Sequence, residues 1–556
     1  MIKFSKTFYK DILAILCIVV TGVLVLKGFS ERVDINLTDD SGYLVLGLRI
    51  AEGALAGFGP LYSVMFKVLK QFTDDTIQIY DTAMYLMYIL PPVAAYLFLR
   101  TLGLSVVVTL LISVGFMVSP NIMSFITWSK ISHYTIILIM IWAILTTKLR
   151  STLSILFSLL IFTFFLGYIR PESHLSFYIS AIIFFGFWAW KERFRFQIKW
   201  LLFLIPLLVV MVFFFFFIGN PMGGGRSNIA FAQQFSYNYC EWNGLNHFDW
   251  IQWRDISHKN FGDFNTLGEA FKNNPTLFVK HVLYNFQQYI LKFIAAVQSI
   301  FFPPAIFKWS TYISSVLVIL ILLAKILYVG FSNWWTQVKA LFLKYLWTAL
   351  GLVVIGIPSV VASMVFYTRE HYLLLVMPIV LFVIALILIP SKSEKDTAPR
   401  ILHSVSFAGA ILLILFLRPS LSDYRTFDVW EEYTYPSNRK TIEAVRAMNI
   451  TQEVRQVDYE GGFSIYMPKN FKWANPFNKE TEPYSEFEEK YQPNFYYVTK
   501  ALLSNKFLTE DAEFMDIIER PEAHGFKVIK LQAQNKGYLL VQDSIVIATN
   551  LPANSN

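Results

Sequence analysis

Long apolar runs separated by short polar segments occupy the chain as far as about residue 417. A hydrocarbon core about 30 Å thick is crossed by helices of roughly 17 to 25 residues. Runs of this kind are found at 11–28, 82–100, 103–120, 131–147, 152–168, 174–190, 199–218, 309–328, 343–366, 371–389 and 401–417. Each should be helical, because lipid offers no hydrogen-bond partner to backbone amides. The pattern predicts a polytopic α-helical membrane protein with about eleven transmembrane helices.

Three further segments have apolar residues at helical spacing with polar residues between them. In 41–56, Arg49 and Glu52 lie on the face opposite the apolar residues, as is typical of a helix in the membrane interface. A second such helix is predicted at 61–71, after the break at Gly59 and Pro60. A third is predicted from Pro275, near the end of the long polar loop 219–308.

The apolar pattern ends near Arg418 and Pro419, and the rest of the chain has the composition of a small α/β domain. A helix is predicted at 437–449, with Ser437 as its N-cap. Residues 537–547 are typical of a strand, a turn and a second strand. The chain is therefore divided into a transmembrane part, residues 1–418 with outer loops 29–81 and 219–308, and a soluble domain, residues 419–556.

Composition and charge agree with this division. Of all residues, 55% are hydrophobic and 15% are charged, whereas soluble domains carry roughly 25% charged residues. Residues 419–556 carry 15 basic and 20 acidic side chains, a net −5; residues 1–418 carry 32 and 19, a net +13. An excess confined to the membrane part predicts a topology and a lipid bilayer as partner, and no nucleic acid.

Basic residues gather in alternate loops, such as the run from Lys191 to Arg195, and these loops are predicted to be cytoplasmic. The N-terminus is then cytoplasmic, with the first apolar run kept as an anchor. The loops 29–81 and 219–308 and the domain 419–556 are extracytoplasmic. The expected location is the inner or plasma membrane.

An acidic pair, Asp39 and Asp40, lies just outside the first apolar run, in the sequence Thr-Asp-Asp-Ser-Gly-Tyr. Adjacent carboxylates near a bilayer repel each other, which raises the pKa of at least one and suits it to act as a general base. The alternative is that both carboxylates cap the helix that begins at Ser41.

This motif resembles the signature of GT-C glycosyltransferases, which include protein O-mannosyltransferases and the aminoarabinose transferases of lipid A. Their pattern is Asp-Glu-x-x-Tyr, which Asp39, Asp40 and Tyr43 match with Asp in place of Glu. The stretch that closes the same loop in many members is similar to Gly53, Gly59-Pro60 and Leu61-Tyr62. The resemblance extends to the many-span layout with a terminal extracytoplasmic domain.

The resemblance implies an inverting enzyme that moves a sugar from a polyprenyl-phosphate or polyprenyl-pyrophosphate donor to a lipid, glycan or protein acceptor on the extracytoplasmic face. Asp39 would be the base, and Asp40 would orient the acceptor or the base. Tyr43 and Tyr62 would contact substrate.

Such a donor requires cations for its phosphate. One basic residue lies in each of three short outer loops: Lys130, Arg170 and Arg369. Arginine suits a phosphate because it can bind two oxygens at once. The neighbouring Glu172, His174, Glu370 and His371 are predicted to bind substrate. Alternatively, the three cations are interface anchors that reach towards lipid headgroups.

A metal site built from His133, His174 and His371 with Glu172 and Glu370 is a further alternative, but no paired-histidine motif supports it. Half-buried interfacial histidines are favoured. No cofactor or metal ligand is expected, and a divalent cation is left open.

Two other functions compete with the glycosyltransferase. A lipid-linked glycan polymerase or ligase shares the many-span architecture and would use the loop 219–308. A flippase, a transporter or a non-enzymatic membrane subunit is a rival of another class. Transporters favour charged residues inside spans and paired repeats, and neither is evident here.

Overall fold

The structure is a computed structural model. The described residues are 6–37, 39–50, 59–123, 130–192, 201–219, 226–245, 252–303, 316–317, 319–320, 323–324, 326–327, 329–388, 400–419, 437–458, 462–474, 484–499, 502–504, 506–530 and 537–547. The chain forms two compact units, each made of segments distant in sequence. The helical unit comprises Met1–Lys27, Gly53–Tyr62 and Met84–Thr426, and the α/β unit comprises Gly28–Glu52, Ser63–Ala83 and Phe427–Asn556.

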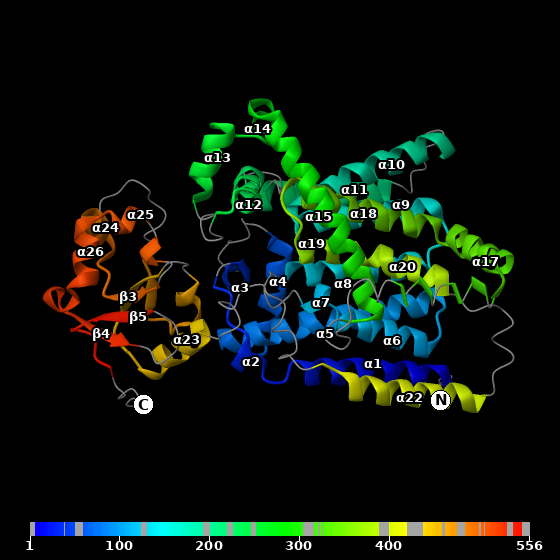
Figure 1. Cartoon of the computed structure of the whole chain (residues 1–556), viewed down its shortest axis with the longest axis horizontal. Coiled ribbons are helices and arrows are strands. Elements are labelled where there is room, and N and C mark those ends of the chain that lie inside the picture. The colour runs from blue at the N-terminus through cyan, green and yellow to red at the C-terminus, as the bar shows by residue number, and fades with distance from the viewer. Residues whose placement is uncertain are drawn as a thin grey trace. The chain divides into compact units, whose positions relative to one another are not determined.

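The helical unit contains most of the apolar helices (Figure 1). Its helices are α1 (Lys6–Val25), α6 (Val106–Met117), α7 (Pro120–Met123), α8 (Ile131–Thr146), α9 (Thr152–Gly167), α10 (His174–Glu192), α11 (Leu201–Phe213), α12 (Arg226–Trp242), α13 (Trp253–Phe261), α14 (Leu267–Asn273), α15 (Pro275–Phe301), α17 (Phe331–Lys344), α18 (Leu346–Val365), α19 (Glu370–Leu374), α20 (Met377–Leu388) and α22 (Arg400–Leu417). Helix α5 (Thr76–Leu102) contributes to both units. Helices α9, α10 and α18 pack together, and α15 packs against both α6 and α18.

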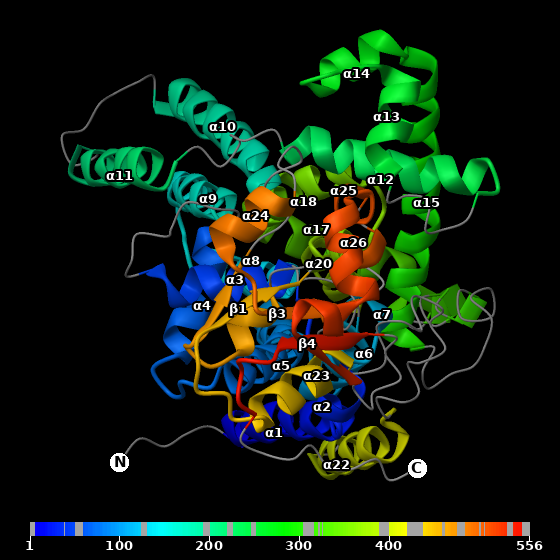
Figure 2. The ribbon, with the colours of Figure 1, turned by 90° about the vertical axis from the view of Figure 1, so that its left-hand side faces the viewer.

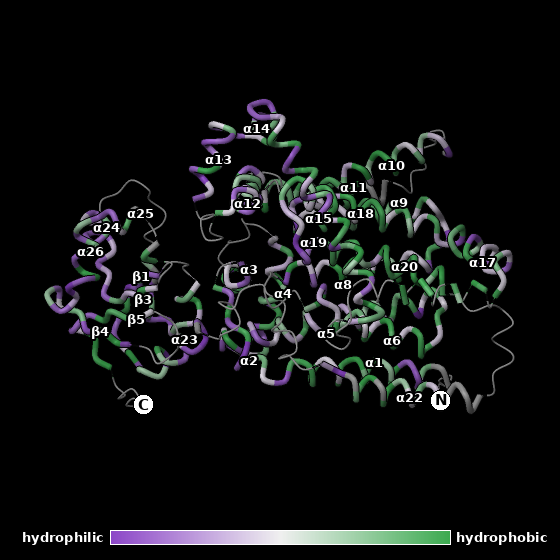
Figure 3. The backbone as a smooth tube through the Cα atoms, viewed as in Figure 1, coloured by the Kyte–Doolittle hydropathy of each residue, from purple (hydrophilic) through white to green (hydrophobic). Residues whose placement is uncertain are grey.

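Among the described residues, four helical segments are long and apolar enough to cross a membrane: Phe8–Arg32, Thr76–Leu102, Pro171–Lys191 and Leu346–Val365. Other apolar helices of 10 to 17 residues coincide with predicted runs, including α6, α8, α9 and α20. Figure 3 shows hydrophobic residues along these helices and hydrophilic ones in α13 and α14. Most of the predicted run 309–328 lies outside the described residues. The larger number of eleven spans stays a prediction.

The predicted run 371–389 was wrong at its start. Its first residues form the separate five-residue helix α19, and the long apolar helix of this region, α20, begins only at Met377. Pro378 is the second residue of α20, a position near a helix start where the missing amide proton of proline costs nothing. His371 therefore lies outside the apolar helix that follows it.

Helices are found at the three places where interfacial helices were predicted, and their location in the membrane interface stays a prediction. α3 (Asp39–Leu48) begins two residues before its predicted start and ends at Leu48, well before residue 56, and residues 51–58 lie outside the described residues; α4 spans Pro60–Leu69. α15 begins at Pro275 as predicted, where the Asn274 side chain accepts a hydrogen bond from the Leu277 amide at 3.1 Å. Its 27 residues continue to Phe301. Figures 1 and 2 show α12, α13 and α14 grouped at the N-terminal end of α15.

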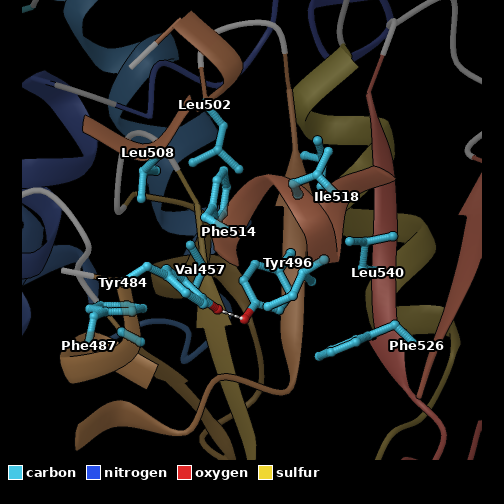
Figure 4. Packing of buried hydrophobic residues seen from close by; sticks show 13 residues of the cluster. Val457, Tyr484, Phe487, Tyr496, Leu502, Leu508, Phe514, Ile518, Phe526 and Leu540 are labelled. Atoms are coloured by element: carbon cyan, nitrogen blue, oxygen red, sulfur yellow. Dashed lines mark hydrogen bonds between the residues drawn. The ribbon is translucent and has the colours of Figure 1, made fainter. Parts of the chain in front are cut away.

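The α/β unit contains a five-stranded sheet in the order β2-β1-β3-β5-β4. The strands are β1 (Val454–Val457), β2 (Phe471–Trp473), β3 (Phe495–Val498), β4 (Phe526–Lys530) and β5 (Tyr538–Gln542). Its helices are α2 (Phe29–Arg32), α3, the end of α4, α23 (Ser437–Ala447), α24 (Tyr484–Tyr491), α25 (Lys506–Thr509) and α26 (Ala512–Glu519). β1 is parallel to β2 and β3, whereas β5 is antiparallel to β3 and β4. Figure 4 shows the apolar core between the sheet and α24 and α26, centred on Phe514 and Tyr496.

Two predictions for the C-terminal segment had different outcomes. The predicted helix at 437–449 is confirmed as α23, which ends at Ala447; Ser437, predicted as its N-cap, is its first residue. The predicted second strand after the turn was wrong, because β5 is followed by a turn at Asp543 and Ser544 and pairs with β3 and β4 instead. Both edges of β5 are therefore already occupied by strands from elsewhere in the chain.

Candidate functional site

Asp39 and Asp40 occupy the first turn of α3, where the helix dipole favours negative charge. Their environments are opposite: Asp39 is exposed, whereas Asp40 is 0% exposed. Tyr43 is half-buried and lies four residues after Asp39, so both side chains project from the same face of α3. Of the two carboxylates, only that of Asp39 is presented at the surface of its unit.

The buried face of α3 is held by hydroxyl groups. Ser41 is 0% exposed, and its Oγ donates a hydrogen bond to the Asn36 carbonyl oxygen at 2.5 Å. The Tyr466 hydroxyl lies 2.7 Å from the same Oγ. Burial raises the pKa of Tyr466, and the nearby Tyr80 and Asp40 raise it further. The Tyr466 phenol is therefore neutral over the physiological range and retains a proton to donate.

The predicted cations are found in the helical unit. Arg170, which precedes a short 3₁₀ turn (Pro171–Ser173), is 5% exposed. Its Nε donates to Glu172 Oε1 at 2.6 Å, a second nitrogen donates to the Ser132 hydroxyl, and the guanidinium lies 5.0 Å from the centre of the Tyr372 ring. An interface anchor would reach the surface, whereas Arg170 is enclosed by partners from three helical elements.

Several of the predicted cations lie close to His371. It lies within electrostatic range of Arg170, Arg369 and His133, and Lys130, 2% exposed, lies within the same range of His133. Burial, followed by the positive charges of Arg170 and Arg369, holds the pKa of His371 well below its ordinary value. His371 is therefore neutral, and the net positive charge of the cluster comes from the arginines and lysines.

Lys292 of α15 joins this cluster, although sequence reasoning missed it. Its Nζ donates to Glu370 Oε1 at 3.0 Å and to the Thr368 carbonyl oxygen at 2.9 Å. It also lies within electrostatic range of His371. The available signal was a single lysine in the otherwise uncharged C-terminal part of α15, because an isolated charge in a largely apolar helix commonly marks a functional site.

α15 also holds the segment that carries Arg369. The buried Asn285 side chain donates to the carbonyl oxygens of Met364 and Phe366, at 3.1 and 2.9 Å. The Thr368 hydroxyl donates to the Asn285 carbonyl oxygen at 3.0 Å. The loop between α18 and α19 is therefore fixed by buried hydrogen bonds on the side that faces α15.

The remaining predicted residues have other surroundings. Tyr62 is 0% exposed and packs against Tyr134, with ring centres 5.5 Å apart. His174 packs against Phe177 and Tyr178 of its own helix, with ring centres 5.4 and 5.1 Å apart. The structure thus brings Lys130, Arg170, Arg369 and His371 into one cluster, and it places Asp39, Asp40 and Tyr43 in the other unit.

An apolar groove of about 270 Å³ lies between α15 and α20. It is lined by Phe293, Val297, Phe301, Val376, Ile379, Val380, Val383, Ile384, Ile387 and Leu388. On α15 the groove begins one residue after Lys292, and on the other side it begins six residues after Glu370. Lys292, which joins the charged cluster through Glu370, and Phe293, which lines the groove, are thus neighbours on α15.

Within the described part of the chain, no group of three or more His, Cys, Asp or Glu side chains is placed to hold a metal ion. His133 Nε2 lies 2.9 Å from the Ile122 carbonyl oxygen, so this nitrogen is engaged by the backbone.

Comparison with known proteins adds no relative: no protein-family model matches the chain, and no curated protein matches it.

Proposed function

We propose that this protein is a GT-C type membrane glycosyltransferase that transfers a sugar from a polyprenyl-phosphate donor to a lipid, glycan or protein acceptor. The observation that carries the proposal is the cluster of Arg170, Arg369, Lys130 and Lys292 beside an apolar groove. A charged headgroup on a long hydrocarbon chain is a ligand that needs both features side by side.

The cations are assigned to the donor phosphate. The leaving phosphate gains negative charge as the glycosidic bond breaks, and fixed donors in a water-poor site stabilise that charge. Arg369 is partly exposed and precedes α19, so it is the leading candidate to contact the phosphate. Arg170 is already paired with Glu172, so it is assigned the role of adding positive electrostatic potential near the phosphate, without contacting it.

The base is assigned to Asp39, because it is the exposed member of the acidic pair. It would take the proton of the acceptor as the acceptor attacks the anomeric carbon, and direct displacement inverts that carbon. Asp40 is fully buried, so of its two expected roles it is assigned that of orienting the base. The proposed reaction uses no redox cofactor, and a divalent cation stays an alternative source of positive charge.

The test uses the full-length protein, purified in lipid nanodiscs. Undecaprenyl-phosphate derivatives of several hexoses and pentoses are supplied singly, and the undecaprenyl phosphate released is measured by mass spectrometry, together with any lipid-linked sugar that co-purifies. We expect one donor to be consumed. If no donor is consumed and no lipid-linked sugar co-purifies, the protein is better explained as a flippase, a transporter or a non-enzymatic subunit.

Filling the groove should weaken binding of long-chain donors. Val383 lines the groove and is 44% exposed, and Val383→Trp places a bulky ring in it. We expect KM to rise several-fold for an undecaprenyl donor and to change little for a short-chain analogue of two isoprene units, because only the long chain fills the groove. Val353→Trp, at a valine of 43% exposure on α18 outside the groove, is the matched control. Equal effects on both donors would remove the groove from donor binding.

The proposed topology is also testable. The excess of basic residues in alternate loops puts the N-terminus in the cytoplasm and residues 419–556 outside it. A periplasmic-type reporter, such as alkaline phosphatase, fused after residue 556 should be active, and a reporter that requires the cytoplasm should be inactive. The reverse result would place Asp39 on the wrong side for an extracytoplasmic donor.

A further inference from the structure

Near the carboxyl end of β1, the α/β unit packs a segment of its own chain, the residues before α3. β1 lies between β2 and β3 and is parallel to both. The strands that follow β1 in the chain are therefore placed on opposite sides of it, which makes the carboxyl end of β1 the point where the strand order reverses. In open α/β sheets this is the edge at which ligands bind. Here the residues that follow β1 contact the segment before α3. A Cβ added at Gly462 would lie 1.9 Å from the Leu37 carbonyl oxygen, so only glycine permits this approach.

The contact continues through a hydrogen bond of defined direction. Ser41 Oγ donates its single proton to the Asn36 carbonyl oxygen, so the Tyr466 hydroxyl must be the donor in the 2.7 Å contact with Ser41. Ser41 and Tyr466 are both 0% exposed. The hydrogen bond therefore joins the C-terminal segment to α3 two residues after Asp39, in a place closed to water.

Charged side chains also link the C-terminal segment to the segment before α3, through Asp34, and to the start of α5, through Asp75 and Asp81. The Asp34 carboxylate accepts from the backbone amides of Asn438 and Arg439, both at 2.9 Å. The Arg439 guanidinium binds both oxygens of Asp81, at 3.0 and 2.6 Å. Burial opposes the charge of Arg439, but the hydrogen bonds and charge of Asp81 outweigh it and raise its pKa, so the guanidinium stays charged. Arg446 adds a contact with Asp75 at 3.0 Å.

We infer that the C-terminal domain positions the start of α3, which carries Asp39 and Asp40, for catalysis. In this inference Tyr466 is a positioning residue that acts through Ser41 on the first turn of α3. This inference rests on the proposed function, in which Asp39 is the base. A catalytic group displaced by about 1 Å can lose a hundred-fold in rate, so a buried hydrogen bond two residues away affects turnover without touching substrate. The edge of the sheet at which ligands commonly bind thus contacts the segment that carries Asp39.

The test compares two tyrosines that each lose one buried hydroxyl. Tyr466→Phe removes the hydrogen bond to Ser41. Tyr484→Phe is the control, because the Tyr484 hydroxyl pairs with that of Tyr496 in the core of the same domain (Figure 4). We expect Tyr466→Phe to lower kcat roughly five- to ten-fold, the value of one neutral hydrogen bond, with KM for the undecaprenyl-phosphate donor unchanged. Tyr484→Phe should leave both constants as in the wild type.

A second readout does not depend on activity. Amide hydrogen exchange over α3, measured on the full-length protein in nanodiscs, should be faster in Tyr466→Phe than in the wild type and unchanged in Tyr484→Phe. Ser41→Ala should reproduce both effects of Tyr466→Phe. The double variant should add nothing, because the two hydroxyls share one interaction. If Tyr466→Phe proves too unstable to purify, Ser41→Ala against Tyr484→Phe gives the same comparison.

The possible results separate the two ideas. Unchanged exchange over α3 in Tyr466→Phe overturns the inference, and so does faster exchange with unchanged kcat, which would make the contact structural alone. Turnover unaffected by Asp39→Asn would remove the proposed function instead. In that case, the hydrogen-exchange comparison alone decides whether Tyr466 holds the start of α3 in place.

Discussion

The Asp39→Asn variant is expected to lose roughly 10²–10⁴-fold in kcat, the contribution typical of a positioned general base. Asparagine keeps the size of the side chain and a hydrogen-bonding oxygen, but it cannot take a proton from the acceptor. Donor affinity should change little, because the donor phosphate is assigned to cations of the helical unit. The measurement is single-turnover release of undecaprenyl phosphate together with equilibrium binding of the donor.

Asp74→Asn is the matched control for this substitution. Asp74 is also an exposed carboxylate of the α/β unit, but it lies outside α3, so its loss should leave turnover unchanged. If Asp39→Asn weakens donor binding as much as it lowers kcat, Asp39 holds a ligand instead of accepting a proton. If it changes neither, the acidic residues at the start of α3 serve the helix dipole alone.

Arg369→Lys should already reduce activity, and Arg369→Ala should reduce it further. Lysine keeps the charge but loses the two parallel N–H groups that bind a phosphate. Alanine removes a charge-assisted contact of about 1.5–3 kcal/mol, or roughly ten- to a hundred-fold in kcat/KM. An interface anchor behaves differently, because lysine reaches the headgroups as well as arginine does. Arg100→Lys is the control: Arg100 is partly buried and pairs with Asp11 at 2.7 Å, at an end of α5 predicted to be cytoplasmic.

The same substitutions at Arg170 should be distinguished by stability. Arg170 is nearly buried and paired with Glu172, so Arg170→Ala leaves that carboxylate without its partner and should lower the melting temperature as well as the activity. Arg369→Ala should affect activity more than stability, because Arg369 is partly exposed. Full activity of the Lys and Ala variants at both positions would leave Lys130, Lys292 or a metal ion as the source of positive charge.

The elements that were predictable from the sequence are those whose signal lies within a few turns of chain. The start of α15 follows from Pro275, because proline is favoured in the first turn of a helix, where its missing amide proton has no partner to lose. The apolar helices follow from uninterrupted hydrophobic runs. The start of α20 was missed because its predicted run merged with a short polar helix, and hydrophobicity alone does not separate the two.

The candidate site was predictable only in part. Arg170 and Arg369 could be selected because cations in short loops at helix ends are visible in the sequence. Lys292 could not, because its role comes from a contact with Glu370, 78 residues away. The substrate contact of Tyr62 stays a prediction, and the complete burial of Tyr62 against Tyr134 could not be predicted from the neighbouring sequence.

The sequence by itself determined that the chain is mostly helical, where most of its apolar helices lie and the position of the acidic pair, because periodicity and hydrophobicity are properties of neighbouring residues. Only the tertiary structure decided that Asp39 is exposed and Asp40 buried, although the two are adjacent and chemically identical. Asp40 lies within electrostatic range of the buried Tyr80 and Tyr466, which come 40 and 426 residues after it in the chain. Burial of a polar group depends on which distant segments cover it and satisfy its hydrogen bonds, and no local pattern contains that information.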